Sequence, residues 1–272
     1  MYSEPIKAKK FTHYLTGMRG IAALLIMAEH AIRYYMHNYY NGLSESMAVA
    51  GMSLFFVLSG FVLTLNYSHS FDAGQRAVGI YNFFIARLAR LGPLYYVIII
   101  IVLWSETSIR DQWLSILSYF TMTQSWFHKE DLMFHVSWSI STEVFSYVFF
   151  PLIIILLSAA KSTKSLLLSY LGVIAGGIGI TYLFYVYGSF LLYNFPKFAG
   201  DDAETDISWI RFYNPYIRLF DFMAGCVAAR LYLHPTAFAR LSKPVAYSFL
   251  YTAMGGIIFL LIYKAHHIGE PM

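Results

Sequence analysis

The sequence predicts an all-α protein that forms a polytopic transmembrane helical bundle. Of its 272 residues, 58% are hydrophobic and only 12% are charged, and the mean hydropathy is +0.55. A soluble domain of this size could not bury so much apolar surface. The long unbroken apolar runs favour helices, because a helix satisfies its own backbone groups inside a bilayer. The alternating pattern of a membrane β-barrel is missing.

About seven segments are long enough to cross a hydrocarbon core of about 30 Å. They lie near residues 15–36, 47–67, 83–104, 137–158, 165–187, 213–233 and 245–264. The apolar piece from Asp111 to Gln124 is shorter, so we expect a short re-entrant or interfacial helix there. Residues 1–272 are therefore expected to form a single membrane domain.

The distribution of positive charge predicts how this domain is oriented. If the piece from Asp111 to Gln124 does not cross, one side collects Lys7, Lys9, Lys10, Arg76, Arg87, Arg90, Lys161, Lys164, Arg230, Arg240 and Lys243. Cytoplasmic loops carry this excess. We therefore expect a multi-pass protein of the cell (inner) membrane, with a cytoplasmic N-terminus retained as an anchor. Pro196 to Asp206 would then be an acidic outer loop, and no nucleic-acid partner is expected.

Arg19 and His30 lie inside one of the most apolar stretches of the chain. Ionisable groups at membrane depth usually mark a functional site. The two residues are eleven apart, which is close to three helical turns, so they share one helix face and are separated by about 16 Å along the axis. The predicted orientation places Arg19 toward the cytoplasm and His30 toward the outer surface.

Glu143 closes the polar sequence Ser137-Trp-Ser-Ile-Ser-Thr-Glu143, which begins a span expected to run from outside inward. Helix rise places its carboxylate about 9 Å below the outer surface, at a depth similar to that of His30. An imidazole and a carboxylate in one layer could support general-base catalysis. The alternative is a structural polar contact between helices, but an embedded Arg, His and Glu together favour function.

Arg87 and Arg90 begin the third expected span, and their spacing of three places them on one helix face. Such a pair could bind phosphate oxygens. Ordinary positive charge flanking a span explains them equally well at this stage.

Other features favour structural roles. Small residues in Ser53 to Phe61 would let the second helix pack closely, and Glu29 and Arg33 have the spacing of a local ion pair. Cys226 is the only cysteine, which excludes an intrachain disulfide. Neither a zinc-binding helix motif nor a phosphate-binding loop is present, so we expect no metal and no permanently bound cofactor.

Several motifs resemble the acyltransferase-3 family of integral membrane O-acyltransferases. The opening helix LTGMRGIAAL (15–24) followed by His30 is similar to the family's Arg-x10-His helix. Further matches are FFVLSGF (55–61), RLARLGP (87–93), WSISTE (138–143) and RLFDFMAG (218–225). The family core has about ten spans against about seven here, so we expect either a fragment or a shortened member, truncated at its C-terminus.

The resemblance implies transfer of an acyl group, acetyl or another short acyl, from cytoplasmic acyl-CoA to a hydroxyl of a cell-surface or exported glycan or lipid-linked acceptor. It assigns catalysis to His30 and Arg19 and makes Glu143 a further candidate. Arg87 and Arg90 would bind CoA, which is a co-substrate. Arg19, or the hydroxyls from Ser137 to Ser141, could stabilise the carbonyl oxygen, and we assign Ser137, Trp138 and Ser141 to substrate binding.

Two other functions fit the same residues. A transporter or flippase could use the buried Arg, His and Glu as a relay, although no pair of broken helices is visible. A catalytically silent membrane scaffold is the second. Within the enzyme hypothesis, direct transfer and an acylated-histidine intermediate both remain open.

Overall fold

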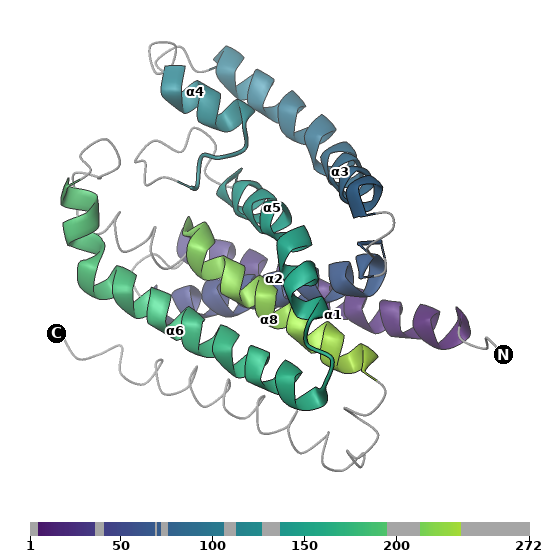
Figure 1. The fold of residues 1–272 in the computed structure, drawn as a ribbon. Helices are drawn as coiled ribbons and strands as arrows, with labels where there is room; N and C mark the ends of the chain where they lie inside the picture. Colours follow the sequence, from purple (N-terminus) through teal and green to yellow (C-terminus); the bar gives the residue numbers. More distant parts are fainter. Residues whose placement is uncertain are drawn as a thin grey trace.

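The computed structural model describes residues 5–35, 41–68, 70–71, 76–105, 113–126, 137–194 and 213–234. In these ranges the chain is all-helical, as the sequence predicts. The helices are α1 (Pro5–Tyr35), α2 (Asn41–Tyr67), α3 (Arg76–Ser105), α4 (Trp113–Phe120), α5 (Trp138–Ser158), α6 (Thr163–Asn194) and α8 (Pro215–Leu233). They form a bundle with α2 and α8 at its centre and α6 and α3 on opposite sides (Figure 1).

Six of the expected spans coincide with a long helix, but three helices begin well before the expected residue. α1 begins at Pro5 instead of residue 15, α2 at Asn41 instead of residue 47, and α3 at Arg76 instead of residue 83. Polar residues occur in the first turns of these helices, so an apolar window places the beginning too late. The expected span at 245–264 and the acidic loop at 196–206 lie outside the described residues.

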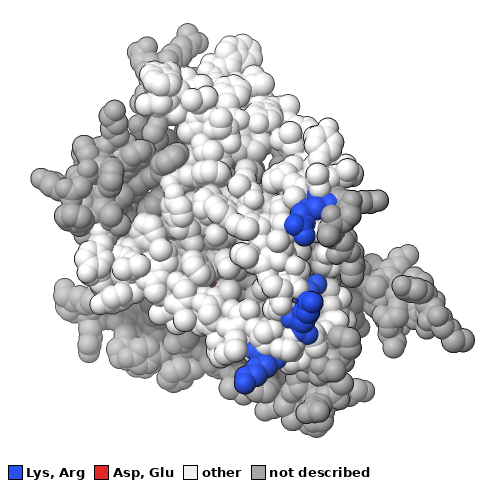
Figure 2. All heavy atoms as spheres, in the orientation of Figure 1, with Lys and Arg blue, Asp and Glu red and all other residues white. Residues whose placement is uncertain are grey.

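Four of the described helices are long and apolar enough to cross a membrane: Met47–Tyr67 of α2, all of α3, all of α5 and Thr163–Phe184 of α6. α1 and α8 carry charges within their apolar runs. The view in Figure 2 agrees with a membrane protein, because Lys and Arg gather along one side and most of the remaining described surface is uncharged. The total of about seven spans stays a prediction.

The short piece before α5 is helical, as expected. α4 has 8 residues, which rise about 12 Å and cannot cross a bilayer. It ends with Met122 in the left-handed conformation at φ 55°. The amide of Thr123 donates to the Ser118 carbonyl, and that of Met122 to the Tyr119 carbonyl. This pair of bonds is a Schellman motif, in which glycine is the usual left-handed residue.

Local sequence explains where α8 starts. Asn214 is its N-cap, and the side-chain oxygen accepts hydrogen bonds from the amides of Tyr216 and Ile217 at 2.8 and 3.3 Å. Pro215 occupies the first helical position, where its missing amide hydrogen costs nothing. α8 is therefore specified by its own first residues before it packs on any neighbour.

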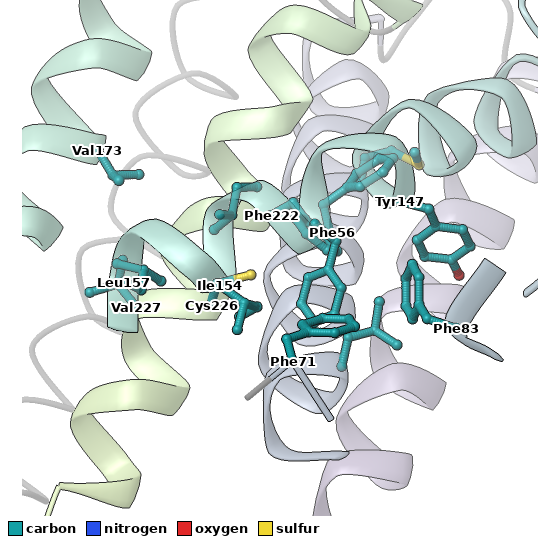
Figure 3. Packing of buried hydrophobic residues seen from close by; sticks show 14 residues of the cluster. Phe56, Phe71, Phe83, Tyr147, Ile154, Leu157, Val173, Phe222, Cys226 and Val227 are labelled. Atoms are coloured by element: carbon teal, nitrogen blue, oxygen red, sulfur yellow. The ribbon is translucent and has the colours of Figure 1, made fainter. Parts of the chain in front are cut away.

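The apolar core lies where α2, α3, α5 and α8 meet, and its centre is aromatic. Phe56, Phe83, Phe150 and Phe222 are fully buried, one from each helix. The ring of Phe150 lies 5.0 Å from that of Phe83 and 5.9 Å from that of Phe222, and Figure 3 shows Phe83 beside Tyr147 at one end of the cluster. The Phe150–Phe222 contact is edge-on and the Phe83–Phe150 contact is tilted. Aromatic pairs of this kind stabilise a core beyond their buried area.

Two glycines allow the backbones of α2 and α8 to approach closely. A Cβ at Gly60 would collide with the Phe222 carbonyl oxygen, and one at Gly225 would collide with the Val57 carbonyl oxygen. The Cys226 thiol donates to the Gly60 carbonyl oxygen across the same contact (3.6 Å). This confirms the packing role expected for the small residues of the second helix.

Gly60→Ala should therefore destabilise the protein, by about 1–3 kcal/mol, because the added methyl group meets backbone that cannot move independently. Thermal unfolding in detergent is the measurement. Gly179→Ala on α6 is the matched control, since no heavy atom lies within 4 Å of a Cβ there. Equal unfolding temperatures for the two variants would contradict the close contact.

Candidate functional site

Charged side chains from α1, α3 and α5 form a polar cluster beside the aromatic core. We define it as Arg19, Arg87, Arg90, Glu143 and Tyr147. Arg19 is electrostatically coupled to the other four residues, and Arg19 Nη2 also donates to Ser59 Oγ of α2 at 3.4 Å. Four helices, α1, α2, α3 and α5, thus contribute side chains to one site.

Glu143 interacts with every other residue of the cluster. Its carboxylate accepts a hydrogen bond from the Tyr147 hydroxyl, one turn further along α5, and it is attracted by the charges of all three arginines. A carboxylate in an apolar helix is costly unless it is paired. The neighbouring guanidinium groups and the phenol supply that pairing.

Arg87 lies in an aromatic box. Its guanidinium carbon is 5.4 Å from the ring centre of Tyr67, 5.8 Å from that of Phe83 and 5.9 Å from that of Tyr147. Arg87 Nη2 also donates to the Tyr67 hydroxyl at 3.0 Å. These contacts hold the planar group by cation–π attraction and leave part of it unbonded.

Two donors of the cluster have no partner in the part of the chain that the structure describes. They are Arg19 Nε and Arg87 Nε, and both are buried. Buried polar atoms are nearly always hydrogen-bonded, so a bare N–H group needs an explanation. A ligand with oxygen acceptors, such as a phosphate, a carboxylate or a thioester carbonyl, would satisfy both.

Arg87 and Arg90 lie further along their helix than the expected span implied. Because α3 begins at Arg76, they are 11 and 14 positions into the helix, about 16 and 21 Å along its axis. The sequence placed them near the start of the third span at the cytoplasmic face, and that position in the membrane stays a prediction. Charge that merely flanks a span belongs at a helix end, whereas these residues face the cluster.

His30 and Glu143 have separate partners, contrary to the expected pairing. Glu143 is engaged by Tyr147 and the arginines, while His30 Nδ1 lies 3.3 Å from a carboxylate oxygen of Glu29. The His30 side chain is 58% exposed and that of Glu29 only 4%. The similar depth expected for His30 and Glu143 did not imply a contact between them, because three arginines attract the Glu143 carboxylate. The Arg33 side chain, the partner expected for Glu29, lies outside the described residues.

Ser137 and Ser141, expected to bind substrate, are fully buried in a hydroxyl network. The Ser141 hydroxyl accepts from the Ser125 amide at 3.1 Å and from the Ser125 hydroxyl at 2.8 Å. The Ser137 carbonyl accepts from Gln124 at 2.9 Å. Trp138 packs on Tyr213, with ring centres 4.9 Å apart. These contacts tie the segment after α4 to the start of α5.

A cavity of about 280 Å³ opens next to the cluster, between α3, α4 and α5. Arg87 and Tyr147 line it together with mainly apolar side chains such as Leu88, Phe120 and Val148. A larger apolar cavity of about 590 Å³ lies between α6 and α8, and none of the predicted site residues lines it. Only the smaller cavity combines a guanidinium group with apolar walls.

Sequence reasoning missed Tyr67, Tyr147 and the contact of Glu29 with His30. Tyr147 could have been found, because it stands four positions after Glu143 and so shares its helix face. Tyr67 gave no such signal, since it lies on α2 and contacts Arg87 of α3 only in the folded bundle. Glu29 was assigned to Arg33 by spacing alone.

Comparison with known proteins gives the family. The model of the acyltransferase-3 family, described as an acyltransferase domain, matches residues 12–271, and the chain belongs to this family. The peptidoglycan O-acetyltransferase OatA of Listeria monocytogenes is 25% identical over 256 residues, covering 88% of this chain and 36% of that protein.

Two further relatives extend the comparison. A Staphylococcus aureus (strain COL) protein described as a candidate O-acetyltransferase is 23% identical over 280 residues, covering 94% of this chain and 42% of that protein. Protein 2 in the picA locus of Rhizobium radiobacter is 40% identical over 81 residues, covering 30% of this chain and 38% of that protein. The chain thus spans less than half the length of the Listeria and Staphylococcus relatives. No solved structure matches it.

The hydroxyl network predicts that Ser141→Ala lowers the free energy of unfolding by about 1–3 kcal/mol, because the buried Ser125 amide loses its acceptor and the Ser125 hydroxyl keeps only its contact with Thr142. Unfolding in detergent measures this. Ser105→Ala is the control, since that exposed hydroxyl bonds to the Val102 carbonyl of its own helix and should be nearly neutral. Unchanged stability together with lost substrate binding in Ser141→Ala would instead identify Ser141 as a substrate contact.

Proposed function

We propose that the protein is a membrane O-acyltransferase that moves an acyl group, acetyl or another short acyl, from cytoplasmic acyl-CoA to a hydroxyl of a cell-surface or exported glycan or lipid-linked acceptor. The observation that carries this proposal is the polar cluster, in which three arginines and one carboxylate meet beside an apolar cavity. Family membership supports the reaction class. The Listeria relative is a peptidoglycan O-acetyltransferase, which supports a glycan acceptor.

The donor would bind at the cluster. CoA carries phosphate groups, and Arg87 and Arg90 offer guanidinium groups suited to phosphate oxygens. The unpartnered Nε–H groups of Arg19 and Arg87 are further donors for an anionic or carbonyl oxygen. Glu143 and Tyr147 would hold these arginines in place, and the cavity beside Arg87 leaves room for part of the donor.

His30 would act on the acceptor. Its exposed ring can take the proton from an acceptor hydroxyl, so that the oxygen attacks the thioester carbonyl carbon and forms an ester. The carbon–sulfur bond then breaks, and the proton passes from His30 to the leaving CoA thiolate. Arg19, about 16 Å from His30 along α1, would guide the CoA arm from the cluster toward His30. With the N-terminus in the cytoplasm, His30 would lie toward the outer face of the cell membrane.

The proposal is tested by incubating purified protein with labelled acyl-CoA and a panel of glycans. We expect transfer by the wild type, and a loss of at least a hundredfold in His30→Ala, which is the scale of a lost general base. His234→Ala is the control, since that histidine bonds Thr163 and the Lys161 carbonyl near the α5–α6 turn. Near wild-type transfer by a folded His30→Ala variant would remove His30 as the base.

Replacing both Arg87 and Arg90 with Lys separates phosphate binding from simple positive charge. The double variant keeps the charge but loses the planar fork, so acyl-CoA affinity should fall about tenfold to a hundredfold. Equilibrium binding of CoA and of its 3′-dephosphorylated analogue measures this, and a larger loss for CoA would place the 3′-phosphate here. Arg230→Lys, at the far end of α8, is the control. Unaltered affinity for both ligands would move the donor site elsewhere.

A further inference from the structure

Glu29 is a buried carboxylate next to the residue proposed as the base. Its side chain is 4% exposed, whereas that of His30 is 58% exposed. Consecutive residues on a helix are about 100° apart, so Glu29 turns into the bundle while His30 turns out of it. Glu29 Oε2 nevertheless lies 3.3 Å from His30 Nδ1. An ionisable side chain buried in a membrane helix usually marks a functional position.

The contact involves one particular nitrogen of the ring. A carboxylate that faces Nδ1 favours the tautomer in which Nδ1 carries the hydrogen, and this leaves the Nε2 lone pair free to accept a proton. The same carboxylate stabilises the imidazolium that forms once Nε2 is protonated. Because Nδ1 is turned toward a buried group, Nε2 is the nitrogen left for an acceptor.

We propose that Glu29 is the positioning residue for His30. It fixes the tautomer and direction of the ring, while Glu143 serves the arginines of the donor site. This inference rests on the proposed function, and it divides the two carboxylates between the two halves of the reaction. During transfer the proton moves from the acceptor hydroxyl to His30 Nε2 and then to the CoA sulfur, and Glu29 gains and loses no proton.

The first test needs no activity. Nitrogen NMR of histidine-labelled protein in nanodiscs reports the tautomer of each ring, and His30→Ala identifies the His30 signals by their loss. We expect the Nδ1–H tautomer in the wild type and in Glu143→Gln, and a shift toward the Nε2–H tautomer in Glu29→Leu. Unchanged His30 signals in a Glu29→Leu variant whose other histidine signals match the wild type would overturn the proposal.

The second test uses the steady-state kinetics of transfer. Glu29→Gln keeps the shape but removes the charge, so kcat should fall by at least about tenfold while KM for acyl-CoA stays the same. Glu29→Asp, which restores a carboxylate, should recover part of kcat. Glu143→Gln should instead raise KM for acyl-CoA. A Glu29→Gln variant with unchanged kcat, or with a change in KM alone, would contradict a positioning role.

The two tests separate this inference from the proposed function. If the wild type transfers no acyl group, the proposed function fails, and the NMR result still decides whether Glu29 orients the His30 ring. If the wild type is active and Glu29→Leu leaves the tautomer unchanged, the proposed function stands and the role given to Glu29 is wrong.

Discussion

The close contact between α2 and α8 is the constraint on which the rest of the bundle depends. At Gly60 and Gly225 each backbone lies where the other helix would otherwise place a side chain. Inside a bilayer there is little hydrophobic force between helices, so packing of this kind drives their association. Three other long helices are then arranged around this pair, because α1 packs on α2 while α5 and α6 pack on α8. The long helix α3 joins the bundle through α5.

This arrangement explains how charged groups remain inside an apolar bundle. α8 carries its own ion pair, in which Arg218 contacts Asp221 at 3.1 Å and donates to Ser53 of α2 at 3.0 Å. α1, α3 and α5 instead bring their charges to the common cluster around Glu143. The first group is internally balanced and ties two helices together. The second has more cations than anions, which is the property of a site that binds a ligand.

The pattern of apolar residues along the sequence predicts which segments are helices, but not where each helix begins or which side chains meet. Six long helices and the short α4 could be predicted, because span length and apolar composition are local properties. The starts of α1, α2 and α3 could not, since polar residues extend a helix beyond its apolar window. The aromatic box around Arg87 was also beyond reach, because Tyr67, Phe83 and Tyr147 come from three helices.

The carboxylate assignments show the same limit at the site. Spacing along α1 and α5 placed His30 and Glu143 at similar depths, but similar depth alone does not bring two side chains into contact. Which neighbour stands opposite a side chain depends on how each helix is rotated and on which charges compete for it. Glu143 is surrounded by guanidinium groups, and His30 is left with the residue beside it in sequence.

The excess of guanidinium groups in the cluster also has a thermodynamic consequence. Three cations face one carboxylate, so their mutual repulsion is an unfavourable term in the ligand-free protein, and an anion bound among them removes part of it. Any such ligand then contributes to folding stability by mass action, with about 2.7 kcal/mol at a concentration one hundred times its dissociation constant. Binding of a ligand at the cluster and the packing of α1, α3 and α5 against one another thus stabilise each other.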